Sequence, residues 1–372
     1  MRQEVITKTL NPYMIILARE SRELTQSELA KRLHITQGHL SKIENGLLEI
    51  SEKLLHDLSR IMQYPAQFFL NPSPVYPPSV AFYYKYKSLP KKVQNKICAL
   101  TNICRLHIEH LLLSIDIERH TLPNCDLDEY ETPENIALAL REYWSIAQGP
   151  IKNMTRIVED AGVVVRLFSL ETRAFSGMSM PAGDAYYLLL VNALMPWDRI
   201  RWTLAHELGH ILMHRVPTPN MEEEADRFAA ELLMPAAVIR SELTGLSLVQ
   251  LASLKPRWKV AMSALLRRAF TLKKVSERQY RYLWMRMSSL GWKTREPPEL
   301  DPVPESPFLL AEFIRLHRQT LNYSLEELAD VLGLNPDEFS QLYGGKPPRL
   351  QLLKGGQKQE TDNKHASVRC LQ

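Results

Sequence analysis

Residues 24–46 read LTQSELAKRLHITQGHLSKIENG and predict two short helices joined by a tight turn. Thr25 precedes the first helix, and Glu28 stands three residues later, which is the spacing of a capping box. Thr36 can cap the second helix, and Gly46 closes the unit. The apolar positions that would pack the two helices are Leu24, Leu29, Leu33, Leu40 and Ile43. The stretch therefore predicts a compact helical pair whose second helix has one exposed face.

That exposed face carries side chains that can read DNA. Gln and Lys are able to reach adenine and guanine edges in a major groove, where a second helix of this kind would lie. The candidate DNA-binding residues are Gln26, Gln37, Gly38, Ser41 and Lys42. A helical pair used only for protein contacts is the alternative, because residues 13–70 contain seven Lys or Arg against seven Asp or Glu. A neutral module binds phosphate weakly, so dimerisation to a homodimer or a second basic surface would have to supply the rest.

The stretch resembles the XRE-type (lambda-repressor-like) helix-turn-helix family. The matching residues are Thr25, Gln26, Leu29, Ala30, Thr36, Gln37, Leu40, Ser41, Ile43, Glu44 and Gly46. The resemblance implies a five-helix fold over residues 11–70. His34 departs from the family, which usually has glycine in the turn. Histidine tolerates left-handed φ better than most residues, so we expect a strained but permitted turn.

A second motif lies at residues 206–210, His-Glu-Leu-Gly-His. Residues four apart on a helix lie on the same face, so His206 and His210 can present two imidazoles to one metal ion. Glu207 can reach a water molecule at such a site as a general base. The alternative is a helix whose histidines face solvent or the core. Context favours the metal, because a plausible third ligand follows.

A catalytic zinc site needs a third protein ligand and one open position. Glu222 and Asp226 are one turn apart on a predicted helix, which suits a ligand and a carboxylate that holds a histidine's second nitrogen. His214 is the alternative third ligand, and it could also be a secondary cleft residue or a packed histidine. Glu223 and Glu224 are expected to be solvated charges. Asp198 is expected to cap the helix that carries the two histidines.

HELGHILMH and the segment after it resemble the ImmA/IrrE metallopeptidases, which are gluzincin-like enzymes that cut XRE-type repressors. The matching residues of the second segment are Glu222, Glu224, Ala225, Asp226, Phe228, Ala229, Ala230, Leu232, Leu233, Met234 and Pro235. The resemblance covers roughly residues 80–295. It implies one Zn²⁺ per chain held by His206, His210 and Glu222, with Glu207 as catalytic base. It also implies a protein substrate, an XRE-type repressor or antitoxin. Manganese or iron would suit the same donors. A peptide would add to an edge strand, for which residues 185–192 are the candidate.

The group that would stabilise an oxyanion has no sequence pattern, and Tyr186, Tyr187 and His214 are the candidates. Residues 163–170 and 185–192 are β-branched or aromatic runs of strand length, with a predicted loop between them. Helical periodicity dominates elsewhere. We therefore expect a mostly helical α+β chain with a zincin-like unit around a small sheet.

Two proline-rich stretches divide the chain, because proline resists helix and sheet and acts as a stiff spacer. The expected parts are the helix-turn-helix domain at 11–70, a linker at 71–90, the metallopeptidase domain at 91–244, a basic helix-turn-helix-like subdomain at 245–296, a linker at 297–307, a degenerate C-terminal helix-turn-helix-like unit at 308–345 and a disordered tail at 346–372.

The two later helical units differ in charge. Residues 255–295 hold twelve Lys or Arg against Glu277 alone, which indicates either a nucleic-acid surface or a solvated basic face of a helical bundle. The C-terminal unit places Pro336, Asp337, Glu338 and Ser340 on its second helix. Acidic groups there repel phosphate, so we interpret this unit as a fold reused for packing, self-inhibition or substrate mimicry.

Composition excludes several classes of protein. A chain of 372 residues with ordinary apolar content predicts two or three globular domains. No apolar run approaches the ~18 residues of a membrane helix, and we expect a cytoplasmic protein. The four cysteines form no CxxC pair, which is typical of reduced thiols. The leading hypothesis is a DNA-associated zinc endopeptidase. The alternatives are a transcriptional regulator whose metallopeptidase-like domain is a sensor or structural module, and an interaction scaffold.

Overall fold

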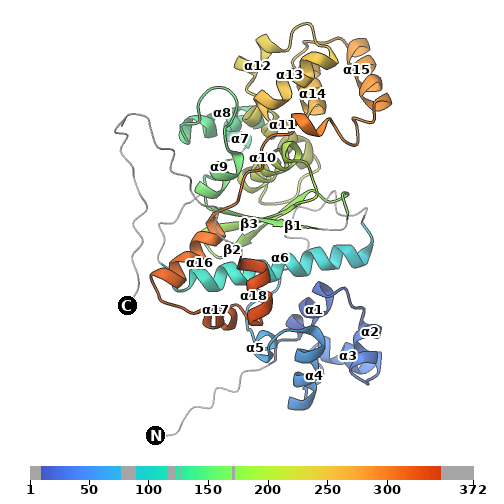
Figure 1. Ribbon diagram of the computed structural model, residues 1–372, viewed down its shortest axis with the longest axis vertical. Coiled ribbons are helices and arrows are strands. Elements are labelled where there is room, and N and C mark those ends of the chain that lie inside the picture. The colour runs from blue at the N-terminus through green and yellow to red at the C-terminus, as the bar shows by residue number, and fades with distance from the viewer. Residues whose placement is uncertain (1–9, 77–88, 116–121, 126, 170–171, 345–372) are drawn as a thin grey trace. The chain divides into compact units, whose positions relative to one another are not determined.

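The computed structural model describes residues 10–76, 89–115, 122–125, 127–169 and 172–344 (Figure 1). The chain divides into two compact units. Unit 1 comprises Met1–Arg119, Met180–Leu188 and Phe308–Gln372, and unit 2 comprises His120–Ser179 and Leu189–Pro307. Helices dominate the described residues and accompany one small sheet, so the predicted mostly helical α+β fold is confirmed. The predicted tail, and most of the predicted linker at 71–90, lie outside the described residues.

The N-terminal module in unit 1 has the five expected helices. They are α1 (Pro12–Ser21), α2 (Gln26–Arg32), α3 (Gln37–Glu44), α4 (Glu52–Met62) and α5 (Ala66–Phe69). The predicted capping box is present, because the Thr25 hydroxyl accepts from the Glu28 amide and the Glu28 carboxylate accepts from the Thr25 amide. Thr36 caps α3 as predicted. His34 has a φ of 56°, so the turn does use a left-handed histidine.

Unit 1 also contains a second helical pair of the same form. The remaining helices of the unit are α6 (Lys91–Leu112), α16 (Leu309–Gln319), α17 (Leu325–Val331) and α18 (Pro336–Tyr343). Ser324 and Glu327 form the capping box of α17, and Gly333 supplies the left-handed turn with a φ of 64°. Glu338 of α18 forms an ion pair of 2.8 Å with Arg22. The α17–α18 pair is therefore docked on the N-terminal module.

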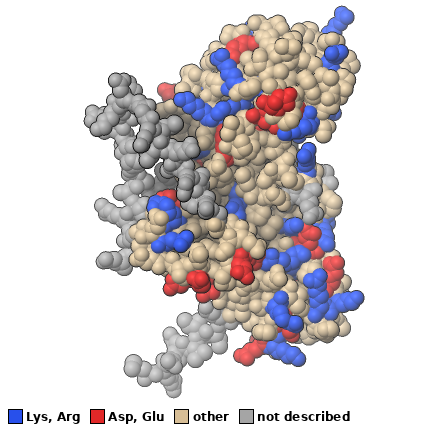
Figure 2. Space-filling model, viewed as in Figure 1, with Lys and Arg blue, Asp and Glu red and all other residues tan. Residues whose placement is uncertain are grey.

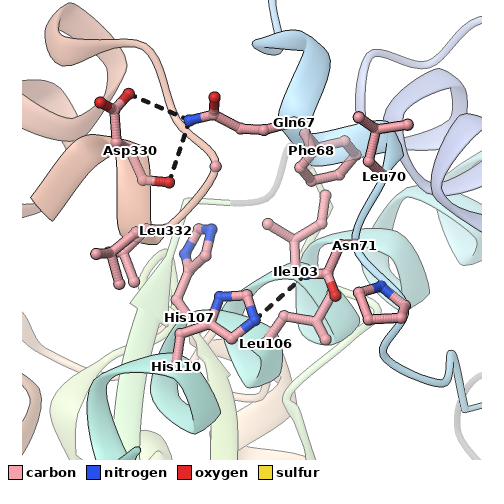
Figure 3. A pocket seen from close by; sticks show the side chains of 13 residues that line it. Gln67, Phe68, Leu70, Asn71, Ile103, Leu106, His107, His110, Asp330 and Leu332 are labelled. Carbon is pink, nitrogen blue, oxygen red and sulfur yellow. Dashed lines mark hydrogen bonds between the residues drawn. The ribbon is translucent and has the colours of Figure 1, made fainter. Parts of the chain in front are cut away.

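A cavity of about 530 Å³ lies where α5, α6 and the end of α17 meet (Figure 3). Its lining is mainly apolar, and His107 and His110 reach it from one side of α6. Gln67 on its rim donates to the Asp330 carboxylate at 3.1 Å, which ties α5 to α17. The cavity shares no residue with the His-Glu-Leu-Gly-His segment.

Unit 2 holds the helices that carry the candidate metal ligands. They are α7 (Leu127–Tyr130), α8 (Pro133–Tyr143), α9 (Met154–Asp160), α10 (Trp197–Met213), α11 (Met221–Leu233), α12 (Ala236–Glu242), α13 (Leu248–Trp258), α14 (Met262–Thr271), α15 (Glu277–Ser289) and the short 3-10 helix η3 (Pro298–Leu300). Helix α9 ends before Gly162, whose φ of 87° lies in the left-handed region that favours glycine. Arg227 of α11 donates two hydrogen bonds to Glu134 of α8, at 2.9 and 2.7 Å.

The predicted cap of α10 is wrong. The helix begins after Pro196, and Asp198 lies inside its first turn. The Asp198 carboxylate is buried and accepts from the Lys255 ammonium at 2.6 Å. An unpaired buried lysine would be costly, and the Asp198 carboxylate pairs with it. The helix already begins after Pro196 and forms without a side-chain cap.

The sheet has one strand more than the sequence suggested. Its strands are β1 (Val163–Phe168), β2 (Gly177–Ala182) and β3 (Tyr186–Asn192), in the order β1-β3-β2. Strand β2 falls in the predicted loop, because GMSMPA contains glycine and proline and no β-branched residue. Strand β3 is central and hydrogen-bonded on both sides. The prediction that a peptide adds along residues 185–192 is therefore wrong, since only an edge strand can accept one.

Among the residues that the structure describes, no helix combines the length and the apolar content needed to cross a bilayer. Cys98, Cys104 and Cys125 are buried. Basic and acidic side chains are interspersed on the visible face of the molecule, and no large area of a single sign stands out there (Figure 2).

Candidate metal centre and DNA-recognition helix

Helix α10 brings two imidazoles together. His206 and His210 are one turn apart and are 5% and 1% exposed, respectively. Their Nε2 atoms are 3.0 Å apart. Two ring nitrogens at this distance face a common point, as the four-residue spacing predicted.

Helix α11 adds a carboxylate to this point. One Glu222 oxygen lies 3.3 Å from Nε2 of His210, and the other lies 3.6 Å from Nε2 of His206. Ligand atoms of the three residues all fall within 4.8 Å of one another. Interaction with His206, and then with His210, holds the pKa of Glu222 far below its usual range, so the group is a carboxylate at neutral pH. Two imidazoles and a carboxylate suit a divalent transition metal with an open coordination position.

Gly209 explains how α11 comes this close to α10. A Cβ atom at Gly209 would lie 2.9 Å from Cδ1 of Phe228 and 3.3 Å from its Cγ. Only a residue without a side chain lets the buried Phe228 ring rest against the α10 backbone. The glycine between the two histidines therefore serves the helix packing that brings Glu222 to them.

Glu207 follows His206 in α10 and is 6% exposed. The Ser179 hydroxyl of β2 donates to its carboxylate at 2.9 Å. Sequence reasoning missed Ser179, because it missed β2. The one available signal was Gly177: a Cβ there would lie 2.6 Å from Cγ2 of Thr203, so β2 approaches α10 at a glycine.

Asp226 lies where the sequence predicted a supporting carboxylate. Its Oδ1 atom is 2.8 Å from Nδ1 of His206. Because a carboxylate only accepts, Nδ1 of His206 carries a proton, and Nε2 is the ring atom that faces His210 and Glu222. This is the form of histidine that ligates a metal.

His214 contacts His210 rather than joining the three-ligand cluster. The Nδ1 atoms of the two rings are 3.0 Å apart, and Nε2 of His214 is 2.9 Å from a carboxylate oxygen of Glu224. Both ring nitrogens of His214 are thus engaged, which removes it as an oxyanion donor. Burial lowers the pKa of His214 and favours its neutral form. Glu223 is exposed as expected, but the expectation that Glu224 is a solvated charge is wrong. Glu224 lies two positions after Glu222 on α11, so its side chain leaves the helix about 200° away from that of Glu222. On that side it contacts His214.

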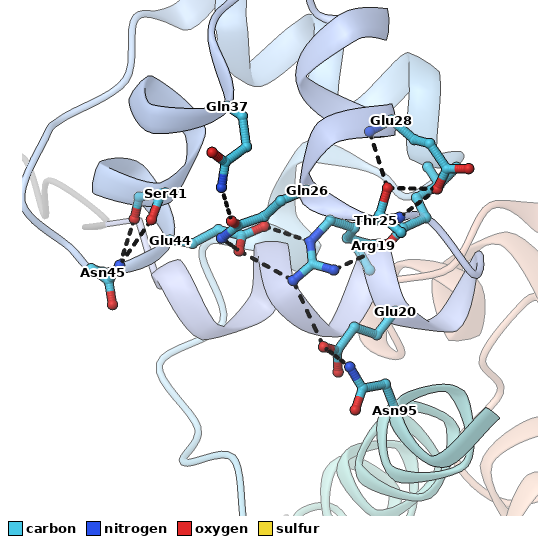
Figure 4. A network of polar contacts seen from close by, with 12 residues as sticks. Arg19, Glu20, Thr25, Gln26, Glu28, Gln37, Ser41, Glu44, Asn45 and Asn95 are labelled. Atoms are coloured by element: carbon cyan, nitrogen blue, oxygen red, sulfur yellow. Dashed lines mark hydrogen bonds and ion pairs between the residues drawn. The ribbon is translucent and has the colours of Figure 1, made fainter. Parts of the chain in front are cut away.

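A separate polar network in the N-terminal module connects α1, α2 and α3 (Figure 4). Arg19 and Glu44 form a buried ion pair, with Nε of Arg19 donating to Glu44 at 2.6 Å. The Gln26 side-chain amide donates to the same carboxylate at 2.7 Å. The Gln37 side-chain amide in turn donates to Oε1 of Gln26 at 2.7 Å. Gln26 therefore holds Gln37, whose second N–H and carbonyl oxygen remain available to a base edge. Arg19 and Glu44 were not among the predicted site residues.

The other predicted DNA contacts lie on or beside the same face of α3. Gly38 and Lys42 are exposed, and Ser41 is half-buried. Asn45 donates to the Ser41 carbonyl at 2.7 Å and closes the helix end. The structure thus brings Gln26 and Gln37 into direct contact and leaves the remaining residues on an accessible surface.

The basic stretch at 255–295 divides into two groups. Lys255 and Arg268 are buried in ion pairs with Asp198 and Glu231 and therefore support the fold. The face of α15 is different, because it exposes Arg278, Arg281, Tyr282, Met285 and Arg286. A nucleic-acid surface on α15 stays a prediction.

The fold and the ligand cluster define a protein that joins a repressor-like helical module to a metallopeptidase-like domain. Comparison with protein-family models agrees with this definition. Residues 15–69 match the model described as helix-turn-helix, and residues 158–270 match the peptidase model described as IrrE N-terminal-like domain. The predicted fusion is therefore confirmed: the chain carries a DNA-binding type of domain and an IrrE-like domain. No curated protein matches the chain.

Proposed function

We propose that the chain is a zinc-dependent endopeptidase with an attached DNA-binding module, and that it cleaves a cognate XRE-type repressor or antitoxin. The observation that carries the proposal is the convergence of His206, His210 and Glu222. The buried Glu207 lies on the same helix, directly after His206. A regulator that uses this domain only as a sensor would have no need for a base at position 207.

One Zn²⁺ would be held by the two Nε2 atoms and the Glu222 carboxylate. When bound, zinc supplies Lewis acidity to the scissile carbonyl and to the attacking water. Glu207 accepts the water proton and passes it to the leaving amine. The Ser179 hydrogen bond holds the Glu207 carboxylate in one orientation for both transfers.

The substrate position follows from the strand order. Strand β2 is an edge of the sheet, and Ser179 places its first half beside Glu207. A peptide that adds to residues 177–179 by main-chain hydrogen bonds would pass Glu207. This placement replaces the excluded one along β3.

The DNA-binding part of the proposal rests on Gln37 and on the face of α3 around it. The module is neutral overall, so a homodimer or the α15 surface would provide the further phosphate contacts. Cleavage of a repressor by a protein tethered near its operator would switch on transcription.

Glu207→Gln tests the enzymatic part. We expect the variant to bind zinc as wild type does and to cleave the XRE-type repressor encoded by the neighbouring gene about 10²–10⁴-fold more slowly. Cleavage is followed by gel and mass spectrometry, with Glu223→Gln as the matched surface control. Undiminished proteolysis by the Gln variant would remove Glu207 from this role. Zinc binding by wild type without any cleavage would support the regulator alternative.

A further inference from the structure

His210 has a second contact beyond the candidate metal cluster. Its Nε2 atom faces His206 and Glu222, while its Nδ1 atom lies 3.0 Å from Nδ1 of His214. On the far side of the His214 ring, Nε2 lies 2.9 Å from Glu224. The side chains of His210 and His214 are each 1% exposed, and that of Glu224 is 21% exposed. Glu224, His214 and His210 thus form a hydrogen-bonded row that leads into the cluster.

The carboxylate at the start of this row sets the donor and the acceptor at each step. Glu224 is a carboxylate acceptor, so Nε2 of His214 must carry a proton. A His214 ring that donates through Nε2 accepts through Nδ1, so Nδ1 of His210 donates to it. Nε2 of His210 is then the ring atom that faces His206 and Glu222. A metal-ligating imidazole requires this orientation, and the group on its other nitrogen normally sets it.

The local fold explains why His214 can do this. Helix α10 ends at Met213, and His214 is its C-cap, with a φ of −115°. Its backbone N–H still bonds to the His210 carbonyl at 2.9 Å, so the residue stays one turn beyond His210. Glu224 comes from the first turn of α11, the same turn that supplies Glu222. One helix therefore provides both a candidate ligand and the carboxylate at the end of the row.

We propose that His214 and Glu224 are positioning residues for the metal centre, which orient His210 and fix its tautomer through one intervening imidazole. This inference rests on the proposed function, because it assumes a metal at the cluster. Asp226 orients His206 directly, through a hydrogen bond with its Nδ1 atom. The two ligating histidines are thus oriented by carboxylates at different distances, one in contact and one through a second ring.

The test measures metal binding by the full-length chain, independently of proteolysis. Zn²⁺ affinity is determined by competition with a chromophoric chelator, and the visible spectrum of the Co²⁺-loaded protein reports ligand geometry. His214→Leu is expected to weaken Zn²⁺ binding about 10–100-fold, the usual cost of losing an outer partner, and to change the Co²⁺ spectrum. Glu224→Gln is expected to weaken it less, because the amide oxygen still accepts from His214. Glu223→Gln, at the adjacent exposed position, should bind like wild type.

His214→Gln separates positioning from packing. The Gln side chain can accept from Nδ1 of His210 and donate to Glu224, so it should restore most of the affinity that Leu loses. The double variant His214→Leu/Glu224→Gln should bind no more weakly than His214→Leu, since the carboxylate acts only through the ring. Thermal unfolding of each metal-free variant checks that the fold is kept. If His214→Leu does not fold, the metal affinities of His214→Gln and Glu224→Gln are compared with that of wild type instead.

The outcomes distinguish this inference from the proposed function. If wild type binds no divalent metal, both are wrong. If wild type binds Zn²⁺ and the Leu and Gln variants bind it equally well with an unchanged Co²⁺ spectrum, only the positioning role is wrong, and His214 is a packed histidine. Graded losses with rescue by Gln support the role, whether or not a protein substrate is cleaved.

Discussion

Two hydrogen-bonded networks in this chain have the same logic but a different charge balance. In the N-terminal module, Glu44 holds Gln26, which holds Gln37. In the metal centre, Glu224 holds His214, which holds His210. Each row begins at a carboxylate and ends at the atom proposed to meet a ligand. The difference lies in the cation: Arg19 pairs with Glu44 within the protein, whereas the cation proposed for Glu222 and the two imidazoles is a bound metal ion.

This difference predicts which property each network supports, the folding stability or the affinity for a ligand. A carboxylate paired with a buried arginine is part of the folded state whether or not DNA is present. A carboxylate that faces two imidazoles gains its full partner only when a cation binds. Helix α3, which we propose reads DNA, should therefore be preformed, and disruption of its network should cost folding stability. Disruption of the metal centre should cost metal affinity instead.

The largest effect on stability is expected for Glu44→Gln. Removing Glu44 leaves the Arg19 guanidinium with only the longer ion pair to Glu20, at 3.7 Å, which should lower the free energy of unfolding by about 3 kcal/mol. Urea denaturation with a probe in the N-terminal module measures this. Glu49→Gln, at an exposed position of the same module, is the control. A loss below about 1 kcal/mol would mean that the Arg19–Glu44 pair contributes no more than an ordinary surface salt bridge. The claim that this network supports folding stability would then be wrong.

Glu222→Gln should behave in the opposite way. We expect Zn²⁺ affinity to fall at least about 100-fold, because a ligand should matter no less than the outer partners whose loss costs 10–100-fold. The metal-free protein should lose clearly less stability than the Glu44 variant does, because the Glu222 side chain is 30% exposed and solvent screens its interactions. Chelator competition and urea denaturation on the same samples check both statements. A large loss of metal-free stability would show that the cluster is a structural network like the one at Glu44.

The sequence predicted the parts of both networks that depend on local geometry. The spacing of His206 and His210, the turn between Glu222 and Asp226, and the Thr25–Glu28 box all follow from helical periodicity and capping rules. These rules need no knowledge of the rest of the fold.

Contacts that depend on distant segments could not be predicted in this way. Ser179 sits on a strand without β-branched residues, and its place at a sheet edge depends on strand order. Arg19 meets Glu44 across 25 residues of sequence. His214 is a special case, because it leaves the helix as a C-cap. Helical periodicity therefore gives no direction for its ring, and the partnership with Glu224 could be seen only in three dimensions.

Gly209→Ala sharpens the comparison at the level of the helix backbone. The added Cβ would lie 2.9 Å from the Phe228 ring and would push α11 from α10. Overpacking of this kind costs about 1–3 kcal/mol, partly offset by the roughly 1 kcal/mol that alanine gains over glycine in a helix. Zn²⁺ affinity should fall as well, because Glu222 moves with α11. Circular dichroism and chelator competition measure the two effects. Wild-type metal affinity in this variant would mean that the α10–α11 contact does not position Glu222.

Gly38→Ala is the matched substitution in α3, and its expected effect on stability is the smallest and has the opposite sign. No atom lies within 4 Å of a Cβ built at Gly38, which is exposed on the helix that carries Gln37. Alanine should therefore stabilise the module by up to about 1 kcal/mol. If Gly38 permits close approach to DNA, the same methyl group should weaken operator binding, measured by fluorescence anisotropy at fixed salt, because it stands between the backbone and the groove. A gain in stability with unchanged DNA binding would remove Gly38 from the recognition surface but keep the preformed helix. A loss of stability would show that α3 has a contact at Gly38 that its exposed position does not predict.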